Sequence, residues 1–364
     1  MSQDERNESD DEELEDVEAP GWDAIDAALR PIYGDGEPKN HFGTVIPYSL
    51  GGPDPIRGIS VYEVAEPTPH WHYVTYGFSE LYEKESDDPA TSGFGFELTM
   101  RVAQGSGEPE PGESPRWPLS LLQSLARYVF QTGNRFAVGH HMSLGAPLAE
   151  DVETRVQSIG VARDPALPAQ IDTPNGTVAF LQLVGLTDEE LAAAQAWNTE
   201  KLLELLEEHH PWGVTDLRRG SPLDEAECRE RVEQGIEQDG SSMGSTYDTS
   251  LAFVEEGDQV TVRFDVRAVA GLRRAMKGRL LHDRPFMYIN GEERTAVTFV
   301  RADEETPVGV LKDEDDDLVL VLDDALIHKI RDELPEELGA WRLSDEVTFE
   351  VIAEDEGDDE EGDE

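Results

Sequence analysis

The sequence predicts an α+β protein of two domains, and three observations lead to this prediction. The chain has 364 residues, which is enough for two domains of ordinary size, each with its own hydrophobic core. Segments with the period-two pattern of strands alternate along the chain with segments that have helical spacing. We find no repeat period among these segments, which argues against a solenoid and favours a mixed architecture.

The first predicted domain covers residues 21–240 and contains the clearest strand and helix patterns. Residues 93–102 alternate apolar and polar side chains, which is the pattern of a half-buried strand. Residues 117–134 carry leucine, valine and phenylalanine at helical spacing, with Pro118 in the first turn and Gly133 at the end. These two patterns therefore predict a strand at 93–102 and a helix at 117–134.

Further elements complete this domain. Residues 173–185 predict a turn followed by a buried strand. Thr187 and Glu190 have the spacing of a capping box, and they predict the start of one helix that continues to Leu206. A polar helix around residues 224–240 is expected to end the domain.

The second predicted domain covers residues 241–353 and is dominated by strands. We place the boundary near residue 240, where the polar helix gives way to a segment rich in serine, threonine and glycine. One helix is expected at about residues 324–334. Strand patterns occur at residues 258–269, 279–289, 294–302, 316–324 and 344–354.

The charge of the chain is strongly negative. There are 80 acidic residues and 29 Lys+Arg, which gives a formal net charge of −51. Residues 1–18 and 354–364 hold nineteen of the acids and one arginine, so the remaining body still carries 61 acids and 28 bases. The terminal segments 1–20 and 354–364 are predicted to be disordered acidic tails, because they have too few apolar residues to form a core.

The acidic composition of residues 19–353 indicates a high-salt environment and argues against nucleic acid as a ligand. At molar salt the Debye length falls to about 3 Å, which screens the self-repulsion of such a surface, and we therefore predict a halophilic cytoplasmic protein. An acidic protein from an ordinary cytoplasm is the alternative. Clustered Lys and Arg are absent from the sequence, so direct binding of nucleic acid is not expected. The sequence contains no apolar run long enough to span a membrane, and because its first residues are acidic where a secretion signal would be basic, we expect no such signal.

Motifs for catalysis are nearly absent from the sequence. Cys228 is the only cysteine, which excludes an internal disulfide and a thiolate-rich metal site. The segment LGGPDP at residues 50–55 lacks the lysine and hydroxyl residue of a phosphate loop, and no G-x-S-x-G motif occurs. We therefore predict no catalytic residues, no metal site and no cofactor.

The segment HWHYVTYGFSELY, residues 70–82, raises one alternative. His70 and His72 lie two residues apart, which places both on one face of a strand, as two metal ligands would require. A third ligand could come from His140 and His141 or from His209 and His210. A metal-dependent enzyme that uses His70, His72, His140 and His141 is the alternative to a packed aromatic strand without a metal site.

Nine segments along the chain form a specific combination. They are LGGPDP (50–55), HWHYVTYGFSELY (70–82), SGFGFELTMR (92–101), LARYVFQTGN (125–134), TPNGTVAFLQLVG (173–185), AQAWN (194–198), VTDLRRG (214–220), RVEQGIEQDGSS (231–242) and GRLLHDRPFMY (278–288). Together they resemble the Suppressor of fused family, which includes the negative regulator of Hedgehog signalling in animals, and its prokaryotic relatives. The resemblance extends from about residue 21 to about residue 350.

This resemblance implies a fold and a mode of binding. Family members have an N-terminal α/β domain and a C-terminal sheet-rich domain joined by a flexible hinge. The animal protein closes both domains around a short extended segment of a Gli-type transcription factor, which it adds as a strand. In such a fold His70, Trp71 and His72 belong to a packed strand rather than to a metal site.

The resemblance also implies two peptide-binding residues and a class of partner. Tyr128 and His140 occupy positions that face the peptide in the family. Animal members have an aspartate at the second position, which pairs with a histidine of the peptide, so His140 implies a different ligand. The expected partner is an unidentified protein, either a toxin that this chain neutralises as an immunity protein or a regulator such as a transcription factor.

Overall fold

The computed structural model describes residues 18–44, 46 and 48–353. The predicted acidic tails fall outside these residues, except for positions 18–20. Contacts between residues divide the chain into two compact units, one formed by residues up to 137 with 163–183, and the other by 138–162 with 184 onward. The predicted domain boundary near residue 240 stays a prediction.

A large mixed sheet contains the strands of the first half of the chain. Its strand order is β1-β2-β3-β4-β8-β6-β5, with β7 paired to β8 outside this path. Strands β1 to β4 are antiparallel neighbours, whereas β4 and β8 run parallel. The strands are β1 (Asn40–Gly43), β2 (Gly58–Val64), β3 (His70–Tyr76), β4 (Thr91–Ala103), β5 (His141–Ser143), β6 (Val156–Arg163), β7 (Gln170–Thr173) and β8 (Gly176–Thr187).

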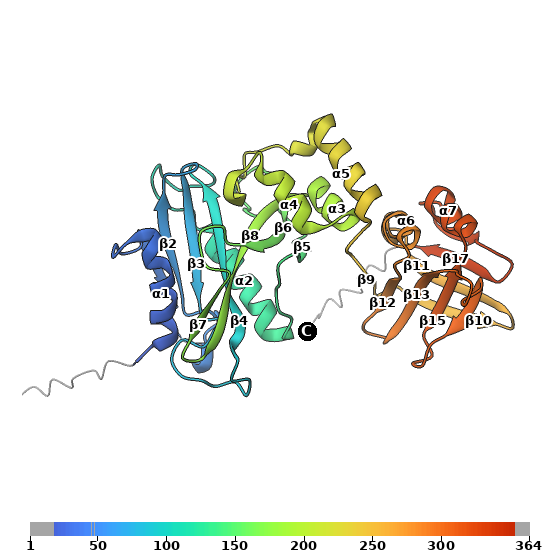
Figure 1. Ribbon diagram of the computed structural model, residues 1–364, viewed down its shortest axis with the longest axis horizontal. Coiled ribbons are helices and arrows are strands. Elements are labelled where there is room, and N and C mark those ends of the chain that lie inside the picture. The colour runs from blue at the N-terminus through green and yellow to red at the C-terminus, as the bar shows by residue number, and fades with distance from the viewer. Residues whose placement is uncertain (1–17, 45, 47, 354–364) are drawn as a thin grey trace, which may run out of the picture. The chain divides into compact units, whose positions relative to one another are not determined.

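Two helices pack against the sheet in the N-terminal unit. Helix α1 (Pro20–Tyr33) buries Ile25 and Leu29 in an apolar cluster with Val74 of β3, and it lies along the sheet in Figure 1. Helix α2 (Trp117–Thr132) ends at Gly133, whose left-handed conformation (φ 73°) permits the C-cap. The predicted strand at 93–102 and the predicted helix at 117–134 are thus confirmed as β4 and α2.

Three helices follow β8. The capping box predicted at Thr187 and Glu190 is present and begins α3 (Asp188–Ala196). The single helix predicted to reach Leu206 is wrong, because Trp197 leaves the helical conformation and the Asn198 side chain caps a second helix, α4 (Thr199–Glu207). The predicted polar helix is α5 (Ala226–Asp239).

Two further sheets and two helices form the C-terminal part. The sheets have the orders β10-β11-β17-β16 and β14-β15-β13-β12-β9, and α6 and α7 lie side by side in Figure 1. Their apolar residues meet in one buried cluster. The elements are β9 (Ser245–Tyr247), β10 (Ala252–Glu256), β11 (Gln259–Asp265), α6 (Ala268–Gly278), β12 (Phe286–Asn290), β13 (Thr295–Arg301), β14 (Gly309–Lys312), β15 (Leu318–Leu322), α7 (Asp324–Glu333), β16 (Gly339–Arg342) and β17 (Val347–Ile352).

This part agrees with the predicted sheet-rich character, but the prediction missed helix α6 and the short strands β9, β10, β14 and β16. The strand predicted at 258–269 ends at Asp265, because Val269, Leu272 and Met276 have helical spacing and bury one face of α6. The strand predicted at 279–289 is shortened to β12, since a 3-10 turn at Leu280–His282 occupies its beginning. The predicted fold class, a mixed α+β protein with a sheet-rich C-terminal part, is confirmed.

Candidate functional site

The two histidines of the HWH segment belong to a buried polar cluster. Both side chains are fully buried on β3, and Arg101 of β4 and Asp164 lie on the same side of the sheet. Arg101 Nη2 donates to Asp164 Oδ1 at 2.8 Å, and Arg101 Nε donates to the Gln182 side chain at 3.1 Å. A charged pair thus fixes the centre of the N-terminal unit.

The hydrogen bonds define the protonation state of His70. Arg101 Nη1 lies 3.0 Å from His70 Nε2, and because arginine can only donate, this nitrogen accepts. His70 Nδ1 carries the proton and donates to the Thr68 carbonyl at 2.7 Å. For His72, Nδ1 lies 2.6 Å from the Tyr33 hydroxyl, and Nε2 lies 3.0 Å from Asp164 Oδ2. A neutral imidazole satisfies the contacts of His70, whereas His72 Nε2, although close to Asp164, has no hydrogen-bond partner of acceptable geometry among the described residues.

The same contacts explain the pKa values. Burial and the nearby Arg101 charge lower the pKa of His70 to about 4, and they also lower the pKa of His72. Burial opposes ionisation of Asp164, but its contacts with His72 and Arg101 outweigh this effect and hold its pKa below the usual range. All four ring nitrogens contact protein groups, and the described residues contain no cluster of three or more potential metal ligands. This geometry favours the packed-strand interpretation of the HWH segment.

We predict that acid destabilises the protein in the pH range set by His70. Between pH 6.5 and about 4 the unfolded chain binds a proton that folded His70 excludes, so the free energy of unfolding decreases as the pH falls through this window. One such group accounts for about 3 kcal/mol. Urea unfolding of His70→Gln at pH 7 and pH 4.5 should show a smaller decrease than the natural chain. The exposed His328→Gln variant of α7 should retain the natural decrease, and an equal decrease in all three proteins would contradict the prediction.

A second buried carboxylate holds the turn that follows β3. Glu97 of β4 is fully buried, and it accepts hydrogen bonds from the backbone N–H groups of Gly77, Phe78 and Ser79 at 2.9, 3.4 and 2.9 Å. The hydroxyls of Ser79 and Thr75 also donate to it, both at 2.6 Å. Burial raises the pKa of Glu97, although these five donors favour the anion. The Glu97 carboxylate thereby holds the backbone of residues 77–79 in place.

Residues 77–79 also line a pocket of about 450 Å³ on the N-terminal unit. Phe130 of α2 lines it, and its ring centroid lies 4.8 Å from that of Phe94 and 5.7 Å from that of Tyr48. Arg57 lies over the ring of Tyr82 at 5.8 Å. Four of the nine segments that carry the resemblance contribute to this aromatic pocket, which could accept an apolar side chain. Spacing alone could not show it, since its residues come from four separate stretches of chain.

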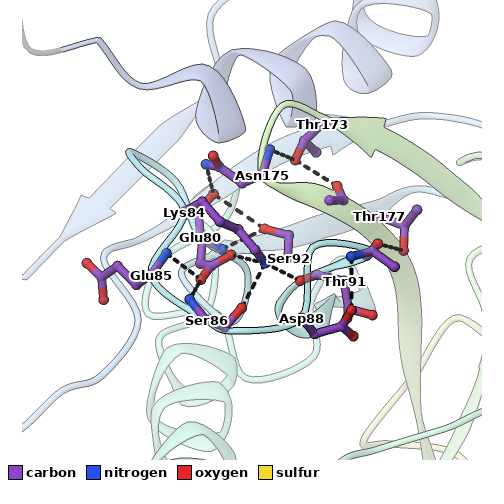
Figure 2. A network of polar contacts seen from close by, with 12 residues as sticks. Glu80, Lys84, Glu85, Ser86, Asp88, Thr91, Ser92, Thr173, Asn175 and Thr177 are labelled. Atoms are coloured by element: carbon purple, nitrogen blue, oxygen red, sulfur yellow. Dashed lines mark hydrogen bonds and ion pairs between the residues drawn. The ribbon is translucent and has the colours of Figure 1, made fainter.

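A lysine-centred network holds the loop beside the aromatic pocket (Figure 2). Lys84 Nζ donates to Glu80 Oε2 at 2.9 Å, to Ser86 Oγ at 2.7 Å and to the Thr91 carbonyl at 2.5 Å. The side chain of Asn175 in the β7–β8 turn donates to the Glu80 carbonyl at 2.9 Å. Hydrogen bonds from Lys84 and from two backbone amides lower the pKa of Glu80 to about 2. The wall of the aromatic pocket is therefore ordered by charge-assisted hydrogen bonds.

The two predicted peptide-binding residues lie on separate elements. Tyr128 is half-buried on α2, its hydroxyl accepts a hydrogen bond from Asn134 Nδ2 at 2.9 Å, and its ring lies 6.2 Å from that of Phe136. His140 is exposed and immediately precedes β5, where its carbonyl accepts from the Val161 amide at 2.9 Å. His141, the fourth histidine of the metal hypothesis, contacts the Thr199 hydroxyl at 3.0 Å. The role of Tyr128 and His140 stays a prediction.

Strands β5 and β9 each stand at the end of a sheet. In β5, residues 140 and 144 bond to β6, so the alternation of an antiparallel pair directs the backbone groups of His141 and Ser143 to the outer edge. In β9, the Gly244 carbonyl and the Asp248 amide bond to β12, which directs the backbone groups of Ser245 and Tyr247 outward. Neither edge is paired with another strand among the described residues. Such edges are templates for strand addition.

The protein therefore belongs to the mixed α+β class. Its surface has open strand edges at β5 and β9 and an aromatic pocket, and such features are suited to binding other proteins. None of the described helices is long and apolar enough to cross a membrane. Residues 52–220 match the profile of the Suppressor of fused protein family (SUFU). The chain belongs to the Suppressor of fused family.

Three relatives illustrate the match. The human Suppressor of fused homolog is 42% identical over 241 residues, which cover 61% of this chain and 48% of the human protein. The chain therefore spans about half the length of that relative. The crystal structure of Drosophila Suppressor of Fused has the same fold, with a TM-score of 0.75, 24% identity, and coverage of 92% of this chain and 97% of that one. A chain of the Sufu–Fu complex is 34% identical, with a TM-score of 0.54 over 60% of this chain and 98% of its own length.

Proposed function

We propose that this protein is a non-enzymatic binding module that takes an extended segment of a partner protein as an added strand between its two domains. The observation that carries this proposal is the pair of open edges at β5 and β9. A peptide strand at such an edge gains backbone hydrogen bonds, and neighbouring pockets select its side chains. The solved complex of a family member with a partner, Sufu–Fu, supports a role in protein binding.

The first test concerns Tyr128. We expect Tyr128→Ala to weaken binding of the partner about tenfold, which is typical when a tyrosine at the centre of an interface is truncated. The chain should remain folded, because this side chain is only half-buried at the end of α2. Isothermal titration with the partner captured from the native host, combined with circular dichroism, measures both effects.

Asn134→Ala provides the matched control for Tyr128. It removes the hydrogen bond to the tyrosine hydroxyl but leaves the aromatic ring in place, so its affinity should stay within about threefold of the natural chain. If Tyr128→Ala binds the partner as tightly as the natural chain, α2 does not contribute to the binding surface. The proposed position of the peptide would then be wrong.

The biological role of the chain depends on which kind of protein it binds, and there are two alternatives. As an immunity protein, the chain would bind and neutralise a toxin, and a toxin gene next to its own gene would support this role. As a regulator, it would sequester a transcription factor. The net charge of −51 supports a protein that works at high salt, and we place it in a halophilic cytoplasm. Mass spectrometry of what co-purifies with the tagged chain at molar KCl distinguishes a toxin from a regulator.

A further inference from the structure

A second pocket, of about 480 Å³, lies next to the open edge of β9. Thr246 and Tyr247 of β9 line it on one side, and Arg267 and Arg274 line it on the α6 side. Tyr247 is 73% exposed, although it is a large aromatic residue. We call this feature the β9 pocket. Its position means that a strand added to β9 would run past it.

Arg274 is the unusual residue of the β9 pocket. Its Nη2 donates to the Gln195 side chain at 3.3 Å, and its buried Nε has no hydrogen-bond partner among the described residues. Within the described part of the chain, no carboxylate lies within ion-pair distance of Arg274. Burial lowers the pKa of its guanidinium, which means that its charge is incompletely solvated. Among the residues that line the β9 pocket, Arg274 is the arginine whose buried Nε lacks an acceptor.

The acids of the β9 pocket do not provide that partner. Asp265 is buried and binds Arg267, with 2.9 Å between Arg267 Nε and Asp265 Oδ1. Asp248 accepts hydrogen bonds from the Tyr288 hydroxyl at 2.9 Å and from Ser250. Both carboxylates are therefore engaged by their own surroundings. Arg274 remains as the uncompensated positive charge.

We infer that the β9 pocket binds a carboxylate of the partner, supplied by an aspartate or glutamate in the segment that pairs with β9. This inference rests on the proposed strand addition and adds the chemistry of the ligand. Successive side chains of a strand alternate between its faces, so a segment paired to Ser245 and Tyr247 directs every second side chain toward one face. A carboxylate there completes the hydrogen bonding of Arg274 by a charge-assisted bond.

The chain itself contains a competing acidic segment. Residues 354–364 hold nine acids and follow β17, whose Ile352 carbonyl accepts a hydrogen bond from Val266 next to Arg267. Binding of this segment instead of a partner is therefore one outcome that the test has to distinguish. The overall charge of −51 disfavours acidic peptides in general, so selection of an acidic peptide requires a local positive charge.

The test is selection of random nonapeptides displayed on phage by the full chain at physiological ionic strength. We expect enrichment of peptides with Asp or Glu at one fixed position, and at least tenfold weaker binding when that residue becomes Asn or Gln. Arg274→Gln should lose the preference, whereas Arg274→Lys should retain it in part. Arg263→Gln, an exposed arginine of β11 paired with Glu350, is the matched control and should select like the natural chain.

The other outcomes distinguish the proposal of strand addition from the inference that the β9 pocket binds a partner carboxylate. Peptides selected without any acid preference would overturn the carboxylate inference and leave strand addition intact. If the natural chain and the chain ending at residue 353 both select no peptide, strand addition itself fails. If acidic peptides are selected only by the chain ending at residue 353, the β9 pocket holds the chain's own acidic segment, and the inference of a partner carboxylate is overturned.

Discussion

Replacement of Asp164 by asparagine is expected to lower the free energy of unfolding by about 3–5 kcal/mol, the usual cost of removing one partner from a buried ion pair. Arg101 and Asp164 both have fully buried side chains, and no water-exposed group can replace the lost charge. Asp164 also accepts hydrogen bonds from the backbone amides of Ala166 and Leu167, so the loop after β6 should loosen as well. Urea unfolding followed by circular dichroism measures the change.

Asp54→Asn is the control for this variant, because it lies in the same unit and has a similar partner. Asp54 binds Arg127 at 2.7 Å, but 37% of the Asp54 side chain and 39% of the Arg127 side chain are exposed. Its replacement should cost less than about 1 kcal/mol. Equal losses in Asp164→Asn and Asp54→Asn would show that the buried ion pair does not hold the N-terminal unit together.

The second large effect is expected for Glu97→Gln, at about 3 kcal/mol. The carboxylate accepts from three backbone amides and two hydroxyls, and whichever way a glutamine amide is oriented, its NH2 group faces at least one backbone N–H. Two donors that face each other in a buried site leave both groups without an acceptor. Urea unfolding at pH 7 gives the loss of stability.

Glu97→Gln should also disturb the surface, because Gly77, Phe78 and Ser79 form part of the aromatic pocket. Faster hydrogen exchange at the amides of residues 77–79 is the expected sign. Glu63→Gln on β2, which removes an exposed pair with Lys39, should leave both stability and exchange nearly unchanged. Unchanged exchange at residues 77–79 in Glu97→Gln would mean that the carboxylate does not hold this turn.

Local patterns in the sequence predicted much of the fold. The alternation in residues 93–102 and the capping box at Thr187 depend only on neighbouring residues, and the structure has both where they were predicted. Two of the failures occur where two patterns compete. The strand predicted at 258–269 was continued past Asp265 to the first residues of α6, because apolar residues continue across this boundary. Asn198 caps a second helix inside a stretch whose apolar spacing continues across the break.

Less of the candidate site could be predicted from the sequence, because its residues come from distant segments of the chain. The HxH spacing correctly placed His70 and His72 on a strand, but Asp164 is about ninety residues away, and only the paired strands bring it to them. The aromatic pocket and the β9 pocket likewise combine residues from distant segments. Arg274 could not be singled out in advance, because an arginine without a carboxylate partner is recognised only when all of its neighbours are known.

The measurement that most directly tests the central claim is hydrogen exchange at the outer edge of β9. The Ser245 and Tyr247 amides should exchange more slowly when a selected peptide is bound, since a strand paired to this edge protects them. The amides of Gly291 and Gly309, which lie in other parts of the C-terminal region, serve as internal references. Slower exchange at Ser245 and Tyr247 alone is the result that strand addition predicts. Unchanged exchange at these two amides while the peptide is bound would contradict it.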